Sequence, residues 1–196
     1  MASGPSIKGI VLQLAVEALQ RGIAQGRLTR TELEARLSQQ DLRLLEEKVV
    51  PGLWYPVESV GRLFELALGS EHPGAGPEAA VQAGVAAGAR LSESQVFRGY
   101  VATATNWGTR GGLALVRMAE VLFNFMRFRY EGTASDANSF RIEVEDAAAL
   151  PDVLRYLVQG GIQHFSERTS GRPVRVTSER PTPDRITYTG TRQSTE

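Results

Sequence analysis

The chain has 196 residues, and its 22 basic side chains equal its 22 acidic ones, so it carries no net charge at neutral pH. This length suits one compact domain, and the balanced charge argues against the general basic surface that binds nucleic acid. Cysteine is absent and only two histidines occur, His72 and His164, so we expect no disulfide, no metal site and no cofactor.

Neither the start of the chain nor any later segment is typical of a secretory signal or a membrane span. Gln13 and Glu17 interrupt the first apolar run, and no small-residue cleavage site follows it. No segment approaches the roughly 18 uninterrupted apolar residues of a membrane span. We therefore expect a cytoplasmic protein without a transmembrane segment.

In the first two thirds of the chain, apolar residues recur at the spacing of amphipathic helices. The pattern predicts a first helix that includes Ile7 and ends near Gly26. The capping-box sequence Thr29-Arg-Thr-Glu32 then opens a second helix. Asp41 is expected to cap a third helix, which Pro51 ends.

The next two helices are marked by prolines at their starts. Pro56 suits the first turn of a helix that ends at Gly69, and Pro77 begins an alanine-rich helix. Within the second, Gly84 and Gly88 are four residues apart, so they share one face and allow a close approach of another helix. A second capping-box pattern, Ser92-Glu-Ser-Gln95, predicts another helix. The glycine-rich segment 108–112 separates that helix from one containing Leu113, Val116, Ala119 and Leu122.

The hydrophobic period then changes from helical to the alternation typical of strands. Residues 125–131 and 139–145 alternate in this way, and turn-forming residues at 132–138 lie between them, which predicts a hairpin. Arg127 and Arg129 lie on the face opposite the apolar residues, where we expect glutamates of the second strand to match them.

The last third continues with one helix and two more strands. Pro151 begins the helix and Gly171 ends it. Strands are predicted over 173–178 and 184–189, with a turn over 179–184. The order therefore predicts an α+β fold in one domain, with a mainly helical N-terminal block (1–123) packed on a C-terminal antiparallel ββαββ sheet (124–190) and a frayed tail (191–196).

Three aromatic residues are candidates for a ligand pocket, because aromatic rings offer a large contact area and a polar tip. These are Trp54, Tyr55 and Trp107. The alternative is that they fill the junction between the helical block and the sheet. No catalytic residues are assigned, since no serine–histidine–acid spacing and no nucleotide-binding glycine motif is present.

Two arginine features are candidate anion or partner sites. Arg110 lies in the segment 108–112, where free backbone N–H groups at a helix start can hold an anion. The alternative is a tight turn between helices that uses glycine. Arg127 and Arg129 could form a basic stripe for an acidic partner or membrane headgroups, or a solvated face that Glu143 and Glu145 neutralise.

The C-terminal third carries a resemblance to a known superfamily. Its marks are Gly160-Gly-Ile162 within a helix, the run Gly171-Arg-Pro-Val-Arg-Val176, and the final segment Pro183-Asp-Arg-Ile-Thr-Tyr188. This order resembles the haem–nitric-oxide-binding domains, the 4-vinyl-reductase-type small-molecule-binding domains and the TRAPP-type vesicle-tethering subunits. More narrowly, the chain resembles a myxobacterial paralogue family of similar length, through Gly52-Leu-Trp-Tyr-Pro56 and Arg62-Leu-Phe-Glu-Leu66.

The resemblance implies the fold and an apolar pocket, but two departures argue against a cofactor. A haem-binding relative needs a histidine on a helix over the pocket and a Tyr-x-Ser-x-Arg clamp for the propionates, and no such clamp occurs here. His164 lies on the last helix, which is the wrong element, and His72 lies in a Pro/Gly loop. The 4-vinyl-reductase-type relatives often carry a cysteine zinc site, which this chain cannot form.

We therefore expect a non-enzymatic sensory or regulatory domain that binds a small apolar ligand or a protein partner, with binding shifting the helical block against the sheet. The alternative is a structural adaptor that acts as a homodimer through its helices. Gly84, Gly88 and the broad apolar face of 7–23 suggest this alternative.

Overall fold

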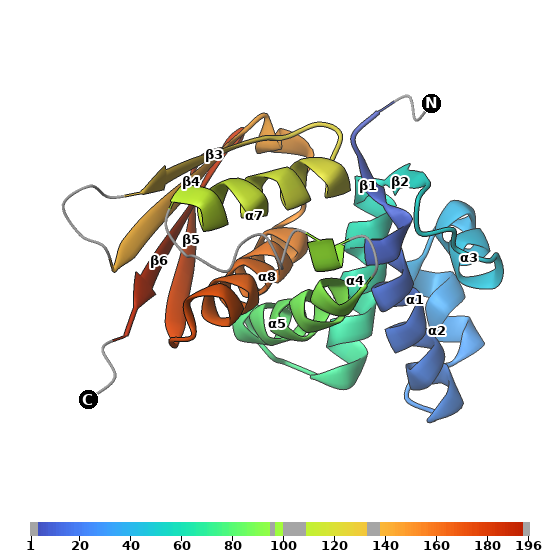
Figure 1. Ribbon diagram of the computed structural model, residues 1–196. Helices are drawn as coiled ribbons and strands as arrows, with labels where there is room; N and C mark the ends of the chain where they lie inside the picture. The colour runs from blue at the N-terminus through green and yellow to red at the C-terminus, as the bar shows by residue number, and fades with distance from the viewer. Residues whose placement is uncertain (1–3, 95–96, 100–108, 133–137, 194–196) are drawn as a thin grey trace.

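A computed structural model describes residues 4–94, 97–99, 109–132 and 138–193 of the chain (Figure 1). The helices are α1 (Gly9–Ala24), α2 (Arg30–Arg36), α3 (Gln39–Glu46), α4 (Val57–Glu71), α5 (Pro77–Glu93), α7 (Thr109–Leu122) and α8 (Asp152–Ser170). The strands are β1 (Ser6–Lys8), β2 (Trp54–Pro56), β3 (Arg127–Gly132), β4 (Ser139–Glu145), β5 (Val174–Thr182) and β6 (Arg185–Arg192).

The α+β architecture predicted from the sequence is confirmed. The last four strands form one antiparallel sheet in the order β3-β4-β6-β5. One face of this sheet is apolar and buried, and α7 and α8 pack on it (Figure 1). The connection through α8 places β5 and β6 beside the β3–β4 hairpin, so the ββαββ order closes into a single layer.

The other face of the sheet is charged and matched across the strands. The register places Arg127 opposite Glu145, Arg129 opposite Glu143, and Glu131 opposite Arg141. This is the pairing of arginine with glutamate that the alternating pattern predicts. Such exposed cross-strand pairs stabilise a sheet by about 0.2–1 kcal/mol each.

The N-terminal block contains the predicted helices with two corrections. The Thr29–Glu32 capping box is present at the start of α2. Ile7 does not begin the first helix but lies in β1, which pairs with β2. The residue that caps α3 is Ser38, and Asp41 lies at the third helical position, where it completes the reciprocal box with Ser38. The helix begins earlier than predicted, and the buried carboxylate of Asp41 also pairs with Arg62, which is partly exposed.

The predicted helix start at Ser92 is wrong, because Ser92 lies in the last turn of α5. Its side chain is only 3% exposed and continues the stripe of small residues that begins at Gly84 and Gly88. The packing of that stripe extends the helix past a sequence that would otherwise cap a new one. Most of the helix predicted after Ser94 lies outside the described residues.

The first strand connects distant parts of the chain, which the helical patterns did not predict. The backbone N–H of Ser6 donates to Oδ1 of Asn124 at 2.7 Å, and the N–H of Asn124 donates to the carbonyl oxygen of Ser6 at 3.3 Å. Ile7 also forms a bridge with Phe123. The start of the chain is thereby fastened to the end of α7.

The final hairpin is longer than predicted. β5 continues to Thr182 and β6 begins at Arg185, so the turn contains only Pro183 and Asp184. Pro181 is tolerated inside β5 because this strand is at the edge of the sheet, where a missing N–H breaks no ladder, and an irregularity in the register lies between Glu179 and Thr182.

Candidate ligand-binding cavity

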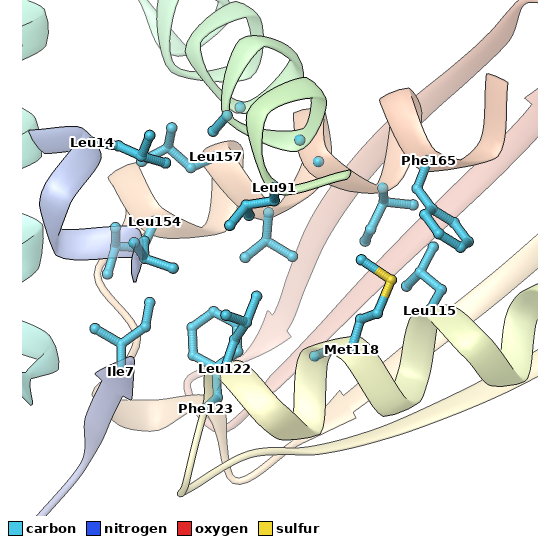
Figure 2. A pocket seen from close by; sticks show the side chains of 18 of the residues that line it. Ile7, Leu14, Leu91, Leu115, Met118, Leu122, Phe123, Leu154, Leu157 and Phe165 are labelled. Atoms are coloured by element: carbon cyan, nitrogen blue, oxygen red, sulfur yellow. The ribbon is translucent and has the colours of Figure 1, made fainter. Parts of the chain in front are cut away.

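An apolar cavity of about 120 Å³ lies where the N-terminal helices meet α5, α7 and α8 (Figure 2). Ile7 of β1 and Leu14 of α1 form part of one wall. Met118 of α7 lies on another side, and Leu157 and Phe165 of α8 extend toward the cavity. The cavity is therefore bordered by segments from the beginning, the middle and the end of the chain.

The lining of this cavity offers almost no hydrogen-bonding side chain. Among the described residues that line it, none is charged, and Ser92 is the only one with a hydroxyl group. A water molecule in a cavity needs two to four polar partners to be stable there. The cavity is consequently suited to apolar contents and not to water or to ions.

Next to the cavity, α5 and α8 touch through their backbones. A Cβ atom at Gly84 would overlap the carbonyl oxygen of Leu157, and one at Gly160 would overlap the carbonyl oxygen of Val81. Glycine at both positions thus lets the helices approach more closely than side chains would allow. The stripe that suggested a homodimer is used inside the chain, as is the apolar face of α1, so these features do not support a dimer.

The spacing between the two helices is looser one turn further along. A Cβ at Gly88 would lie 3.1 Å from the Cβ of His164 and 3.2 Å from the Cα of Gly161, so these neighbours would have to move by a few tenths of an ångström. A Cβ at Gly161 would meet nothing among the described residues nearer than the carbonyl oxygen of Gly84, at 4.0 Å. Both glycines line the cavity, as do Gly84 and Leu157 of the backbone contact.

His164 lies beside the cavity but is not one of the residues that line it. Its Nε2 atom is buried and, among the described residues, has no hydrogen-bond partner. Burial lowers the pKa of His164, and Arg168 lowers it further, while Glu167 and Glu93 oppose this shift. The side chain is therefore a neutral imidazole packed against α5.

The structure places the predicted aromatic pair away from the cavity. Trp54 lies beneath Lys8, whose Nζ is 3.8 Å from the ring centroid and donates to the carbonyl oxygen of Gly52. The hydroxyl of Tyr55 accepts the N–H of Val50 at 3.0 Å. Neither ring lines the cavity. Trp107 is outside the described residues.

The glycine-rich segment before α7 also differs from its prediction. The helix begins at Thr109, so most of the segment belongs to its first turn. A Cβ at Gly112 would overlap the ring of Tyr130, which explains one glycine by close packing with β3. The side chain of Arg110 is outside what the structure describes, and its role with an anion stays a prediction. Leu113 of the same helix is 51% exposed, unlike its apolar neighbours.

Arg127 and Arg129 lie on the charged face of the sheet, on the side away from the cavity. Arg127 pairs with Asp146 at 2.8 Å and approaches Glu145 at 3.9 Å. Binding of an acidic partner there would compete with these carboxylates, and it stays a prediction.

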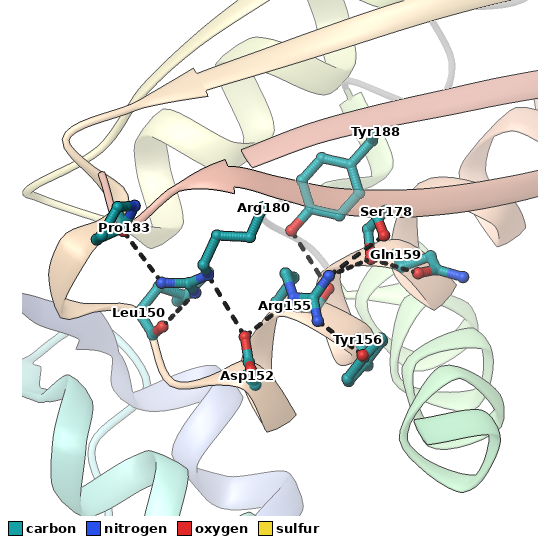
Figure 3. Close-up of polar contacts among 9 residues, drawn as sticks. All are labelled: Leu150, Asp152, Arg155, Tyr156, Gln159, Ser178, Arg180, Pro183 and Tyr188. Atoms are coloured by element: carbon teal, nitrogen blue, oxygen red, sulfur yellow. Dashed lines mark hydrogen bonds and ion pairs between the residues drawn. The ribbon is translucent and has the colours of Figure 1, made fainter. Parts of the chain in front are cut away.

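A second cluster, of polar groups, joins α8 to the sheet (Figure 3). Arg155 is 8% exposed, and it donates to Asp152 at 3.1 Å and to the carbonyl oxygen of Ser178 at 3.2 Å. The hydroxyl of Tyr188 donates to the backbone carbonyl oxygen of Arg155, and burial raises the pKa of this tyrosine. Arg180 pairs with Asp152 at 3.4 Å. Apart from Nε of Arg180, which has no hydrogen-bond partner among the described residues, the groups satisfy one another, so the cluster anchors the helix.

The same face of α8 also protects the edge of the sheet. Gln159 donates to the carbonyl oxygen of Val176 at 2.8 Å, and Glu167 accepts the N–H of Val174 at 3.2 Å. These contacts satisfy backbone groups on the free side of β5, which would otherwise be open to pairing with another strand.

Among the described residues, no group of histidine, aspartate and glutamate side chains could hold a metal ion. Within the same ranges, no helix is long and apolar enough to cross a membrane. The described residues that build the cavity are mostly aliphatic and aromatic ones that the sequence indicates only as core. The one distinctive signal was the pair Gly84 and Gly88, whose spacing indicated a close helix contact.

Comparison with solved structures shows the same fold in H-NOX (haem–nitric-oxide-binding) domains. An unliganded Fe(II) H-NOX protein of K. algicida matches with a TM-score of 0.64 and 10% identity, over 96% of this chain and 98% of that chain. A point mutant of it gives 0.66 and 12%, over 96% and 97%. A point mutant of the T. tengcongensis H-NOX protein gives 0.58 and 15%, over 96% and 98%. No family model and no curated protein matches the chain.

The resemblance of the fold to haem–nitric-oxide-binding domains is thus confirmed, and the narrower resemblances stay predictions. The haem group that this fold implies does not fit the cavity that the described residues build. Its volume of about 120 Å³ is well below the roughly 300–1,000 Å³ of pockets for drug-sized ligands. Among the described residues, no histidine lines it, and none of them offers a basic side chain to pair with the carboxylates of a haem. Met118 supplies the only sulfur atom within this described lining.

Proposed function

We propose that this chain is a non-enzymatic sensory domain that binds a small apolar molecule in the cavity between α1, α5, α7 and α8, without haem. The observation that carries this proposal is a cavity whose described lining is almost wholly hydrocarbon and comes mainly from β1, α1, α5, α7 and α8. Burial of an apolar ligand there contributes about 25 cal/mol for each Å² removed from water.

The position of the cavity gives a ligand a means to act on the rest of the protein. Its walls include Ile7 and Leu14 from the N-terminal block and Leu157 from α8. A molecule that touches both sides favours the arrangement in which both sides contact it. The shift of the N-terminal block against the sheet is the response that we propose, and the Ser6–Asn124 contact lies on the boundary that would move.

The composition of the cavity and of the polar cluster supports a role in binding and not in catalysis. A general acid, base or nucleophile needs a titratable group within reach of a bound substrate. Among the described residues, none lines the cavity. The arginines of the Arg155 cluster are occupied by Asp152 and by backbone carbonyls.

Native mass spectrometry of the protein purified from its own host, followed by a thermal-shift panel of apolar compounds, tests this proposal. We expect a bound uncharged small molecule or saturable stabilisation by members of the panel. Hydrogen exchange should then slow in α1 and α8 together. Addition of haemin should produce no Soret band typical of a ligated iron.

A protein that carries no small molecule and is stabilised by no apolar compound would contradict the proposal. A stoichiometric Soret band after haemin addition would contradict the proposal that the domain acts without haem.

A further inference from the structure

Gly161 stands out among the glycines of α5 and α8 because close packing does not explain it. Gly84 and Gly160 are required by the contact of the two backbones, as their Cβ atoms would overlap carbonyl oxygens. A Cβ at Gly161 would have no described neighbour within 3.9 Å of it, since the nearest, the carbonyl oxygen of Gly84, is at 4.0 Å. Glycine in the interior of a helix is destabilising relative to alanine. The position therefore carries a residue that weakens α8 without a packing reason.

What the missing side chain leaves is space in the cavity. Gly161 lines the cavity, so a side chain at this position would occupy part of its volume. A substitution that would strengthen the helix would thus also reduce the room for a ligand. Loss of stability in exchange for an open binding site is a common compromise in proteins.

We propose that Gly161 keeps the cavity open for one uncharged aromatic molecule in the size class of benzene. This inference rests on the proposed function and specifies the ligand class. An engineered apolar cavity of about 150 Å³ in T4 lysozyme stays dry and binds benzene or xenon. The cavity here, at about 120 Å³, falls in the same range.

The chemistry of the walls favours a ring without strong hydrogen-bonding groups. Phe123 of the segment after α7, Phe128 of β3 and Phe165 of α8 all line the cavity. Aromatic rings attract one another edge to face or in offset stacks, beyond the effect of area alone. A charged or multiply hydroxylated ligand would lose its hydrogen bonds to water and find, among the described side chains of the lining, only the hydroxyl of Ser92 in exchange.

Fluorobenzene, followed by ¹⁹F NMR, is the probe that tests the assignment. We expect saturable binding to the natural protein and displacement by toluene. Gly161→Leu should remain folded and lose this binding. Gly161→Ala should raise Tm by about 2 °C, because alanine is the better helix former, and should weaken the binding.

Gly69 supplies the matched control, because it lies in α4 on the surface and a Cβ there would meet nothing within 4 Å. Gly69→Ala should raise Tm in the same way and leave fluorobenzene binding unchanged. Circular dichroism and Tm establish that each variant is folded before binding is compared.

Three outcomes would overturn the inference. Equal binding of fluorobenzene to Gly161→Leu and the natural protein would place the probe elsewhere. Failure of every ring-sized probe, with a larger apolar molecule bound in the native mass spectrum, would remove the size class and leave the proposed function standing. Failure of the ring-sized probes and of all other apolar compounds would remove both.

Discussion

In the contact between α5 and α8, glycine serves two opposite purposes. At Gly84 and Gly160 the helices touch through their backbones, and a single added carbon would overlap a carbonyl oxygen. At Gly161, the next residue along α8, an added carbon would come no closer than 4.0 Å to a described neighbour, the carbonyl oxygen of Gly84. The first pair brings the helices together, and the second position leaves a cavity beside them.

This difference shows that the surroundings of a glycine, and not its place in a helix, decide its effect on stability. Gly160 and Gly161 are adjacent and equally unfavourable for helix propensity. One is compensated by dispersion contacts between closely packed backbones. The other has no such compensation in the described part of the chain, and for this reason we assign Gly161 a role in ligand binding.

The largest expected effect comes from adding a side chain where the backbones of α5 and α8 touch. Gly160→Ala places a Cβ against the carbonyl oxygen of Val81, with more backbone of α5 behind it, so the helices must separate. We expect a loss of about 3 kcal/mol in the free energy of unfolding, measured by urea denaturation. The neighbouring Gly161→Ala is the matched control and should show the opposite sign. Equal losses in both variants would contradict the comparison.

An intermediate effect is expected at Asp41, which is remote from the contact between α5 and α8 and serves as a reference for pH experiments. Its carboxylate is fully buried and accepts two hydrogen bonds from Arg62, at 2.8 and 3.0 Å. Burial alone would raise the pKa of Asp41, but hydrogen bonds from Arg62, Ser59 and Ser38 lower it to about 2.

Because the folded-state pKa of Asp41 is depressed, its contribution is fully present above the unfolded value near 4 and is lost as the pH falls through about 2. We expect Asp41→Asn to lose about 2 kcal/mol at pH 7 and to unfold with a weaker dependence on pH below 4. Urea denaturation at pH 3 and pH 7 measures both. An unchanged acid dependence in the variant would contradict this assignment.

The smallest expected effect concerns His164, which lies beside the cavity and packs against Gly88 of α5. Burial lowers its pKa, so the unfolded chain takes up a proton before the folded protein does. Its neutral form therefore contributes stability that is fully present above the unfolded pKa of about 6.5 and is lost as the pH falls below that value. Asp41 stays ionised in this range and does not contribute to the change.

His164→Gln should accordingly reduce the difference in unfolding free energy between pH 8 and pH 5, measured by urea denaturation. His72→Gln, at an exposed site after α4, is the matched control. If the pH dependence of the unfolding free energy survives in His164→Gln and disappears in His72→Gln, the assignment to His164 is wrong.

Much of the fold could be predicted because its signals are local. The alternation at 125–131 and 139–145 predicted the hairpin and the matching of arginine to glutamate on its outer face, since side chains on a strand alternate by geometry alone. Pro151 and Gly171 marked the two ends of α8, where proline suits the start of a helix and glycine accepts the positive φ of 66°.

The candidate site could be predicted much less well, because its residues carry no distinctive chemistry. Their aromatic rings make Trp54 and Tyr55 candidates, yet the first lies against β1 and the second bonds to the loop before β2. Met118 and Leu157 were indistinguishable from other core residues until the folded chain left a gap between them. The strand at Ile7 was also missed, since its partners are far away in sequence.

By itself the sequence determined the helical character of the first two thirds and the ββαββ order of the last third, since periodicity, caps and turns act over a few residues. It also excluded thiol and multi-histidine chemistry by composition. Only the tertiary structure decided which glycines touch and which face a void, and that the walls of the cavity come from both ends of the chain. Those outcomes depend on distances between segments far apart in sequence, which no local pattern encodes.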